Sequence, residues 1–485
     1  MKPVFAIGVC IGVLTSAGAV QGAQFTRLGD LDGGAVSSSA NAVSADGKVT
    51  VGASDSGLST GSGQYQLTEP FRWTLPGGMK SLGSINGTAF TGYASGVSTD
   101  GSVIVGSDLS RIEEGDGIFD AFRWTAADGK QLLGPIPTLE QHTLQYVHDV
   151  SADGQIIVGR AEDPFGSFLE SAKAFRWTEA TGMQSLDPSS FAATAAYAIS
   201  SDGQVIAGTR QEASLYFGAA IWTEKDGWKS LGLPQNGNSS ATAASADGKV
   251  IAGSYTGSSS LKTAFRWTPQ GGAVLLTNPA SGEVSDATAV SADGSRVVGH
   301  LITANQGRQA FLWDQVNGVR RVAHILAAAG VDDLADWAWT SATDISPDGS
   351  IIVGQGLNPD GNLEGWIADL STGSTSVLLD IKPGDAKNSI DPDSRGKLKS
   401  AILTSAGFDA STIDVAGVEF GPGAAEPDWY RLDDVDEDGD WDLTLRFETR
   451  AVSLACGDSA ATMTGMTFDG MQIVGTDSIN TVGCR

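Results

Sequence analysis

The nine residues SADGKVIAG, numbers 245 to 253, place an Asp-Gly pair between two segments that favour β-strands. An Asp-Gly pair predicts a tight hairpin turn, because Gly adopts positive φ and Asp accepts hydrogen bonds from nearby backbone amides. Variants of the same stretch begin at residues 44, 98, 151, 200, 291 and 346. The seven copies therefore indicate a repeat whose structural unit contains this hairpin.

A tryptophan follows each Asp-Gly turn. The turn aspartates stand at positions 46, 100, 153, 202, 247, 293 and 348, and a tryptophan lies in the predicted third strand of each unit. Most of these tryptophans precede a second turn and a short segment that often ends in Leu-Gly, so each unit has four predicted strands. A period near fifty with four strands per unit is typical of a β-propeller blade. The tryptophans are Trp73, Trp124, Trp177, Trp222, Trp267, Trp313 and Trp366.

The predicted fold is therefore all-β. It consists of a seven-bladed β-propeller over residues 24–373 and a small β-sandwich-like domain over residues 374–485. The segment from Phe25 to Leu31 resembles the last strand of a unit, whereas the seventh unit ends on its tryptophan strand. We expect the N-terminal strand to complete the last blade, which would leave the ring without an open sheet edge.

The N-terminal segment, 1–23, has the pattern of a signal peptide. Lys2 precedes an apolar run over 4–14, and small residues follow in the spacing that signal peptidase accepts, so we expect cleavage near Ala19 or Ala23. The apolar run is too short to span a bilayer, and no later stretch predicts a membrane helix. The sequence thus predicts a secreted protein whose two remaining cysteines, Cys456 and Cys484, form a disulfide in an oxidising compartment.

The formal net charge of the 485 residues is −27. A charge of this sign argues against nucleic acid and anionic membranes as partners, because both would be repelled. Cationic and neutral partners remain compatible with it, and we expect the protein to be a monomer. No segment has the context of a catalytic motif, and the four histidines show no metal-ligand spacing.

The combined repeat motifs resemble a known family. The strings Ala-Phe-Arg-Trp-Thr at 121–125, 174–178 and 264–268, and ISPDGSIIVGQGLNPDGNLEGWIADL at 345–370, are similar to the bacterial extracellular HAF-repeat family. The resemblance implies secretion and a repeat fold, and it implies no established reaction. The residues that replace the family's signature histidine are Asp120, Lys173, Thr263 and Gln309.

The region from residue 374 resembles a module found at the C-termini of many secreted bacterial proteins. Its strings LDIKPGD, AILT, FDAST, CGDSA and TDSINTVGC carry the resemblance. It also contains the aspartate-rich segment DVDEDGDWD at 434–442, which matches the DxDxDGxxD spacing of calcium loops.

Five aspartates of this segment are predicted to bind Ca²⁺. Four would use carboxylate oxygens and the fifth, Asp440, its backbone carbonyl. Leu445 stands where an EF-hand has its bidentate glutamate, so Glu448 or Asp433 is a candidate for the missing oxygen. The alternative is a solvated acidic turn without a metal. The four predicted carboxylate ligands are Asp434, Asp436, Asp438 and Asp442.

The long links between the second and third strands of each unit predict a ligand face. They are longest in the first three units and combine aromatic residues with carboxylates, which suits a polysaccharide or a protein ligand, although acidic solvated loops have the same composition. We therefore expect a ligand-binding propeller with a calcium-stabilised C-terminal module. The alternative is a secreted polysaccharide-active hydrolase or lyase with its site on this face. The candidate residues are Tyr65, Glu69, Phe119, Phe165, Phe168, Tyr216 and Phe217.

One further pair, His148-Asp149, enters the third unit and is expected near the propeller axis, where a packed or solvent-exposed histidine is the favoured interpretation.

Overall fold

The computed structural model divides the chain into two compact units, one formed by Ala23–Ser371 and one that contains Thr372–Arg485. The structure describes residues 23–484 except 60–65, 84–90, 114–115, 138–142, 164–171, 187–192, 213–215, 235, 258–260, 279–281, 304–306, 332–333, 335, 372–374, 386, 406–407 and 469–471. Each unit has its own hydrophobic core. Residues 1–22 of the predicted signal peptide, 1–23, lie outside the described residues.

The described part of the larger unit contains seven four-stranded antiparallel sheets. The first three sheets are β2(Ser38–Val43)-β3(Val49–Ser59)-β4(Gln66–Thr74)-β5(Gly78–Ser81), β6(Gly92–Val97)-β7(Val103–Glu113)-β8(Asp116–Thr125)-β9(Gly129–Leu132) and β10(Leu144–Val150)-β11(Ile157–Glu162)-β12(Lys173–Thr178)-β13(Gly182–Ser185). The next three are β14(Thr194–Ile199)-β15(Ile206–Gln211)-β16(Phe217–Thr223)-β17(Gly227–Ser230), β18(Asn238–Ala244)-β19(Ile251–Thr256)-β20(Lys262–Thr268)-β21(Gly272–Leu275) and β22(Val284–Val290)-β23(Arg296–Thr303)-β24(Gly307–Asp314)-β25(Gly318–Arg321).

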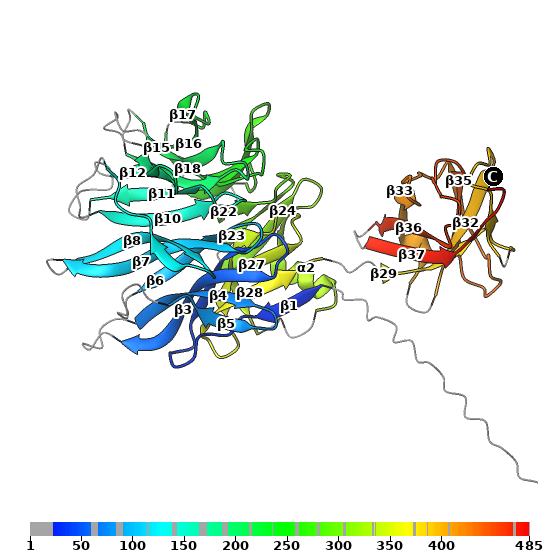
Figure 1. The fold of residues 1–485 in the computed structure, drawn as a ribbon, viewed down its shortest axis with the longest axis horizontal. Coiled ribbons are helices and arrows are strands. Elements are labelled where there is room, and N and C mark those ends of the chain that lie inside the picture. The colour runs from blue at the N-terminus through cyan, green and yellow to red at the C-terminus, as the bar shows by residue number, and fades with distance from the viewer. Residues whose placement is uncertain are drawn as a thin grey trace, which may run out of the picture. The chain divides into compact units, whose positions relative to one another are not determined.

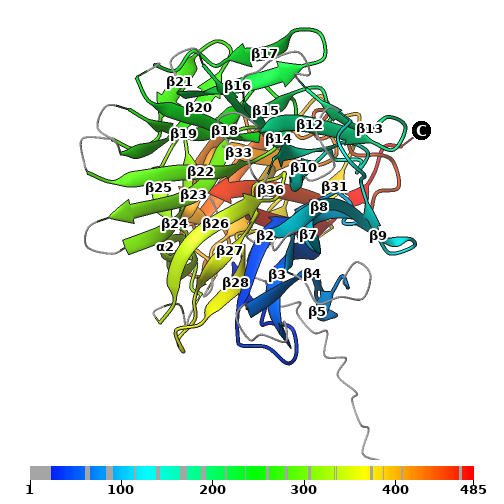
Figure 2. The same cartoon turned by 90° about the vertical axis from the view of Figure 1, so that its left-hand side faces the viewer.

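The seventh sheet joins the two ends of the larger unit. Its strands β26(Ala338–Ile345), β27(Ile351–Leu357) and β28(Leu363–Asp369) are completed by β1(Gln24–Arg27), which pairs antiparallel with β28. The N-terminal strand thus closes the last sheet, as predicted from the sequence. Each sheet contacts the next, and β2 contacts β26, β27 and β28. The blue start and yellow end of this unit lie side by side in Figures 1 and 2, and the arrangement is a β-propeller.

The first strand of each sheet lies toward the inside of the ring and the fourth toward its rim (Figure 2). Short turns join the first strand to the second in all seven sheets and the third to the fourth in six of them, so both sets of turns lie on one face, which we call the turn face. The links from the second strand to the third lie on the opposite face, which we call the loop face. A short helix, α2(Val322–Ala328), follows β25 and buries Val322 and Leu326.

The repeated Ser-x-Asp-Gly turn is held by its own side chains. Asp247 Oδ1 accepts hydrogen bonds from Ser245 Oγ at 2.9 Å and from the Lys249 amide at 3.0 Å, while the Val250 amide donates to Ser245 Oγ at 2.9 Å. Gly248 has a φ of 64°, which a residue with a side chain rarely adopts. Equivalent bonds occur in the other six copies. The turn sequence therefore fixes the hairpin register.

The last glycine of each motif is required by close backbone approach. A Cβ atom on Gly253 would lie 2.0 Å from the carbonyl oxygen of Ser240, and the corresponding distances in all seven sheets are 1.8 to 2.2 Å. The close approach accompanies a β-bulge in the first strand, where the register with the second strand shifts between Ala241 and Ala243. The same shift occurs in every sheet of the ring.

Fully buried aromatic rings pack beside these glycines. Phe175 is paired with Gly159 across the sheet, and the equivalent phenylalanines of four other sheets are also fully buried. Trp366 is paired with Gly354 and takes this phenylalanine position, whereas Ala368 occupies the position of the repeat tryptophan. The prediction that Trp366 is the seventh repeat tryptophan is therefore wrong, because Trp366 lies two positions before the place of that tryptophan. The equivalent phenylalanines are Phe71, Phe122, Phe265 and Phe311.

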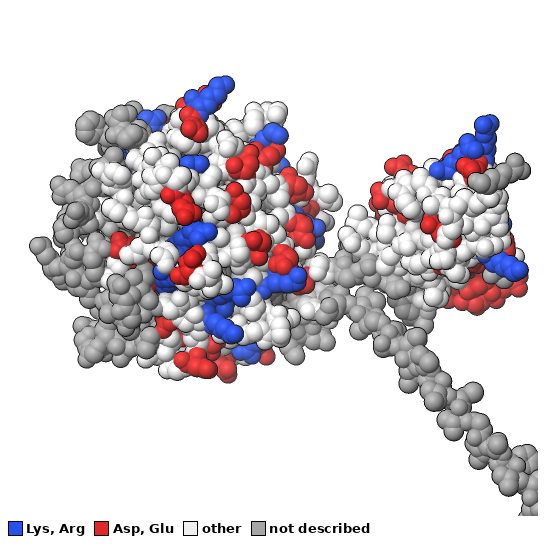
Figure 3. Space-filling view, in the orientation of Figure 1, with Lys and Arg blue, Asp and Glu red and all other residues white. Residues whose placement is uncertain are grey.

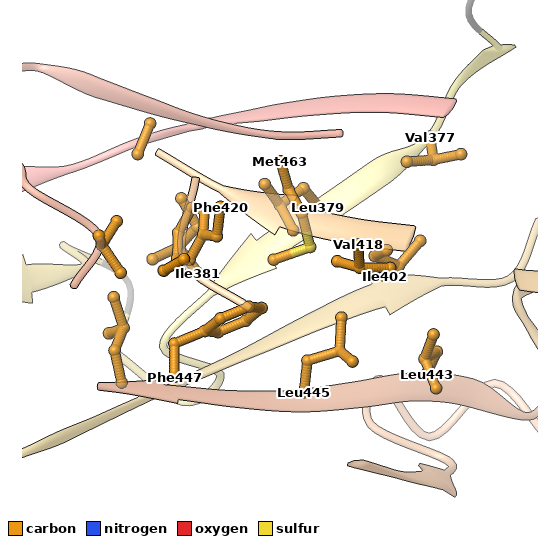
Figure 4. Packing of buried hydrophobic residues seen from close by; sticks show 14 of the residues in the cluster. Val377, Leu379, Ile381, Ile402, Val418, Phe420, Leu443, Leu445, Phe447 and Met463 are labelled. Carbon is orange, nitrogen blue, oxygen red and sulfur yellow. The ribbon is translucent and has the colours of Figure 1, made fainter. Parts of the chain in front are cut away.

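The smaller unit contains two four-stranded sheets and one two-stranded sheet within its described residues. They are β29(Thr375–Ser376)-β37(Gln472–Ser478)-β36(Ala460–Thr467)-β33(Ile413–Phe420), β30(Leu378–Ile381)-β32(Lys397–Leu403)-β35(Asp442–Glu448)-β34(Trp429–Asp433) and β31(Ser389–Ile390)-β38(Asn480–Thr481). A 3₁₀ turn, η3(Ala410–Thr412), precedes β33. Side chains from both larger sheets form one core, in which Phe420 and Phe447 pack with their ring centres 5.0 Å apart (Figure 4).

The predicted disulfide between Cys456 and Cys484 is confirmed, and their Cα atoms lie 5.8 Å apart. No helix in the described part of the chain is long and apolar enough to cross a membrane. Figure 3 shows lysines and arginines dispersed among acidic residues over the visible face of the larger unit.

Candidate ligand and metal sites

A polar cavity of about 220 Å³ lies on the axis of the ring. The bulged residue of each first strand lines it, so one residue from each sheet faces the same space. Each of these residues stands three positions before the serine of the Ser-x-Asp-Gly turn, so the cavity lies toward the turn face. The seven residues are Asn41, Ser95, His148, Tyr197, Thr242, Thr288 and Thr343.

We call these seven bulged residues the axial residues. Four of them donate a hydrogen bond to the neighbouring sheet. Thr242 Oγ1 donates to the Ala287 carbonyl at 2.7 Å, and Thr288 Oγ1 donates to the Ala342 carbonyl at 3.0 Å. Asn41 Nδ2 and Thr343 Oγ1 make the same contact, each at 2.8 Å, with the following sheet. The hydroxyl hydrogens of the three threonines and one amide hydrogen of Asn41 are thus used around the ring, and the oxygen lone pairs of the four side chains remain as acceptors.

His148 is a neutral member of the axial residues. Its Nε2 lies 3.3 Å from Nη1 of Arg160, and its ring packs edge-on against Tyr197 with centres 5.0 Å apart. Burial, with a smaller contribution from the Arg160 charge, lowers the pKa of His148 to about 3. The structure therefore places His148 near the axis, as expected, and keeps its ring uncharged at neutral pH.

Two aspartates follow axial residues and line the same cavity. Asp149 accepts hydrogen bonds from the amides of Val150, at 2.7 Å, and Ile199, at 2.9 Å. Asp344 makes the equivalent bonds where the seventh sheet meets the first. Burial raises the pKa of Asp149 to about 7, with help from the charge of Asp344, and burial raises the pKa of Asp344 to about 6. Both carboxyl groups are deep in the protein and retain access to the cavity.

The turns surround the axis as a hydrogen-bonded collar. In six of the seven sheets, the residue after the turn serine donates its amide to the carbonyl of the equivalent residue in the next sheet, as from Ala246 to Ala292 at 3.0 Å. Six such bonds connect the seven sheets in order. The seventh position is Pro347, which has no amide hydrogen to donate. Asp344 bridges this junction through its bond with the Val43 amide.

The described part of the loop face carries three of the candidate aromatic residues. Tyr216 is 42% exposed, Phe217 begins β16, and Phe119 packs against Tyr146 with ring centres 5.8 Å apart. Arg160 lies over the Tyr146 ring at 4.7 Å and also approaches the axial His148, so Phe119 is linked through side chains to the cavity. The candidates outside the described residues are Tyr65, Phe165 and Phe168.

Glu69 lies in a buried cluster rather than on an exposed surface. It is 9% exposed and accepts a hydrogen bond from Ser81 Oγ. Nearby, Lys130 Nζ lies 2.5 Å from Asp108 Oδ2, and Asp108 Oδ1 has no hydrogen-bond partner among the described residues. Burial raises the pKa of Asp108 and lowers the pKa of Lys130, which is the pattern of paired groups that are removed from water.

Three carboxylates of the aspartate-rich loop converge. Asp434, Asp436 and Asp442 have oxygen atoms that all lie within 4.8 Å of one another. Asp442 is fully buried and accepts amide hydrogen bonds from Thr404 and Val435, both at 2.8 Å. The pKa of Asp436 is raised by loss of water and by the charges of Asp438 and Asp442. The oxygen-rich donor set and the mutual repulsion fit a site for a hard cation such as Ca²⁺.

The other predicted ligands of this loop have different surroundings. Asp438 Oδ1 accepts a hydrogen bond from the Asp440 amide at 2.9 Å, and Asp438 is not part of the converging group. Glu448 pairs with Lys397 at the far end of β35, six positions from Asp442. Because a strand rises about 3.3 Å per residue, Glu448 is too distant to supply the missing oxygen. Asp433 lies opposite Asp442 and is paired with Arg431.

Apart from His148, the axial residues are not predicted from the sequence. Their types differ, from Asn to His to Thr, so no repeated letter identifies them. The available signal was a polar residue at a constant distance before each turn serine, within a strand of small apolar residues. A bulge reverses the inside-outside alternation of a strand, and the simple period-two pattern therefore does not predict which face this residue takes.

Comparisons with known proteins identify weakly similar structures. No family model and no curated protein matches the chain, so the HAF-repeat resemblance stays a prediction. TolB from Acinetobacter baumannii is 15% identical with a TM-score of 0.34, and the matched region covers 48% of this chain and 52% of TolB. This chain therefore spans about half the length of that protein.

Two further structures cover more of the chain. An oligogalacturonate lyase from Vibrio parahaemolyticus is 12% identical, covers 72% of this chain and 97% of its own, and has a TM-score of 0.42. A puromycin hydrolase mutant is 13% identical and has a TM-score of 0.47. The matched region covers 76% of this chain and 58% of the hydrolase chain. These likenesses are too weak to carry a functional assignment to this chain.

Proposed function

We propose that the chain is a secreted seven-bladed β-propeller that binds an extracellular polysaccharide or protein through its loop face. Each of the seven sheets is one blade in this proposal, and β1 completes the seventh. The two larger sheets of residues 372–485 form a β-sandwich module that calcium stabilises.

The observation that carries the ligand-binding proposal is the chain of side-chain contacts from the loop face to the axis. Phe119 stacks near Tyr146, Arg160 lies over Tyr146, and Arg160 contacts the axial His148. Rigid aromatic side chains beside a fixed cation provide apolar surface and polar contacts at low entropic cost, which suits sugar rings or a polypeptide. Loops on a rigid ring are also the usual position of binding residues.

A glycan array and a panel of extracellular proteins test this proposal. We expect Tyr216→Ala to weaken ligand binding at least tenfold, because an exposed aromatic side chain of the loop face is removed. Val316→Ala is the matched control, since Val316 is 92% exposed on a turn-face hairpin and should leave binding unchanged. Equal loss in both variants, or no ligand for the parent protein, contradicts the proposal.

The alternative function is a secreted polysaccharide-active hydrolase or lyase. The observation that favours it is the buried Asp108–Lys130 pair beside Glu69, because perturbed pKa values of neighbouring groups are frequent in active sites. Incubation with polysaccharides, followed by detection of reducing ends or unsaturated products, distinguishes the two functions. Product formation that Asp108→Asn abolishes would establish the enzyme, whereas binding without products supports the binder.

Calcium binding is a separate part of the proposal. Ca²⁺ would be held by the converging carboxylates of Asp434, Asp436 and Asp442, which would neutralise their repulsion and order the hairpin between β34 and β35. Affinity around 10⁻⁴ to 10⁻³ M is sufficient for an extracellular module. Melting of the full chain with Ca²⁺ and with chelator should show a calcium-dependent shift that Asp434→Asn/Asp436→Asn removes. No shift in the parent protein contradicts this part.

Secretion rests on the N-terminal segment, 1–23. We expect the protein in culture medium to begin after Ala19 or Ala23, and N-terminal sequencing of that form tests the prediction. A protein that keeps Met1 and stays inside the cell would contradict it.

A further inference from the structure

The axial cavity combines negative charge with a lining of acceptors. Asp149 and Asp344 bring two carboxylates into it, and no lysine or arginine is among the described residues that line it. Ionising two buried carboxyl groups is costly without a cation, so a cation held in the cavity would stabilise their charged forms.

The hydroxyl groups around the cavity add to its attraction for a cation. Thr242, Thr288 and Thr343 donate their hydrogens to carbonyl groups of the following sheet, which leaves only oxygen lone pairs for the cavity. Asn41 uses one amide hydrogen on the Ala94 carbonyl, which leaves its second amide hydrogen and its carbonyl oxygen, an acceptor. Ser95 Oγ is shielded from bulk solvent and has no hydrogen-bond partner among the described residues.

Backbone amides fix the orientation of both aspartate side chains. Each carboxylate receives one amide hydrogen bond on each oxygen, and in both cases one donor belongs to the next sheet. A carboxylate oxygen has two lone pairs, so one on each oxygen remains free. The volume of about 220 Å³ lies below the usual range of small-molecule pockets, about 300–1,000 Å³, and suits an ion with its water molecules.

We propose that the axial cavity binds one hard metal cation between the carboxylates of Asp149 and Asp344, with axial hydroxyl and amide oxygens or water completing its shell. An all-oxygen donor set selects ions such as Ca²⁺, Mg²⁺, Na⁺ and K⁺ over softer metals. A divalent ion balances both carboxylates, so Ca²⁺ is the expected occupant. The ion would connect the third and seventh sheets across the axis and is independent of the aspartate-rich loop.

The experiment uses the full chain with the loop site removed by Asp434→Asn/Asp436→Asn. After treatment with chelator, this protein is equilibrated with Ca²⁺ or Mg²⁺, and bound metal is measured by mass spectrometry. Sodium and thallium(I) NMR provide the corresponding measurements for Na⁺ and K⁺. We expect one equivalent of a single cation, and we expect that Asp149→Asn/Asp344→Asn in the same background abolishes its binding.

Asp128→Asn/Asp226→Asn in the loop-deficient background is the matched control. It removes two exposed carboxylates from turn-face hairpins and should retain one equivalent. Metal retained at full stoichiometry after the axial substitutions would overturn the proposal, as would absence of every tested cation from the loop-deficient protein. If the axial variant does not fold, anomalous scattering from a crystal of the loop-deficient protein decides the question: an ion on the axis supports the site, and water alone overturns it.

Discussion

At the residue scale, the last glycine of each repeat motif serves the bulge and not the turn. Gly253 does not have a positive φ, but the Ser240 carbonyl occupies the space that a Cβ atom would need. This carbonyl belongs to a paired strand and cannot move without disturbing the sheet. The glycine is therefore a condition for placing Thr242 at the axis, since the same bulge turns that residue inward.

The residue-scale test is Gly253→Ala. We expect a loss of about 1–3 kcal/mol in the free energy of unfolding, the usual cost of forcing atoms into a packed site. Urea unfolding of the full chain measures it. Gly271→Ala in the same repeat is the control, because its Cβ would approach only the end of the Thr268 side chain, and its cost should be much smaller. Similar losses in both variants would contradict the backbone-clash explanation.

Phenylalanine, and not tryptophan, is the central core residue of the repeat. Phe175 is fully buried, whereas Trp177 is partly exposed and donates Nε1 to the Leu133 carbonyl of the preceding sheet at 3.1 Å. We expect Phe175→Ala to cost about 3–5 kcal/mol and Trp177→Ala to cost less. Chemical denaturation of both variants decides the order. A larger loss for Trp177→Ala would restore tryptophan as the main packing residue.

At the element scale, β1 stabilises the ring through side-chain contacts as well as through its four backbone pairings with β28. Phe25 packs against Trp337 and Trp339, with ring centres 5.1 and 4.8 Å away. Arg27 Nη2 lies 2.7 Å from Oε2 of Glu364, whose side chain is only 2% exposed. The strand thus covers an apolar surface and supplies the cation for a buried carboxylate.

A truncation that starts at Gly33 tests this element. We expect a lower melting temperature and aggregation, because the edge of β28 and the tryptophan cluster become exposed and Glu364 loses its ion pair. Light scattering and thermal melting measure the two effects. Arg27→Met keeps the strand and should cause a smaller change. If the truncated protein melts at the temperature of the parent, β1 does not stabilise the ring.

The second element-scale prediction concerns the Cys456–Cys484 loop, which spans 28 residues. On the chain-entropy model, closing a loop of this length contributes about 3–4 kcal/mol. Cys456→Ser/Cys484→Ser should therefore lower the stability of the smaller unit and leave the ring unchanged. Limited proteolysis followed by mass spectrometry identifies which unit opens. Early cleavage within the ring would contradict the prediction.

Hairpins and ring closure could be predicted because local chemistry determines them. The Ser-x-Asp-Gly turn contains its own hydrogen-bonding groups, and the incomplete seventh repeat indicated that the N-terminal strand completes it. The axial site depends on contacts between residues far apart in the sequence. Asp149 bonds to Ile199, and Asp344 bonds to Val43 across 301 positions. No local pattern in either strand indicates these partners.

At the scale of the whole molecule, the repeated turns should make the ring sensitive to acid. The pKa of the turn aspartate is lowered in six of the seven repeats, and Asp247, through its bonds with the side chain and amide of Lys249 and with Ser245, has a pKa of about 2. A carboxyl group whose pKa is depressed on folding stabilises the native state above its unfolded pKa. That contribution is lost as the pH falls from about 4 toward the folded pKa.

We therefore expect the melting temperature of the ring to fall between pH 4 and pH 2. The exposed position of these aspartates makes each contribution small, so the effect should be collective across the turns. Differential scanning calorimetry at a series of pH values measures it. Asp100→Asn/Asp247→Asn should weaken the pH dependence, because an amide does not titrate and two of the six shifted groups are absent. A melting temperature that stays constant or rises over this window would show that the turn carboxylates do not stabilise the ring through their charge.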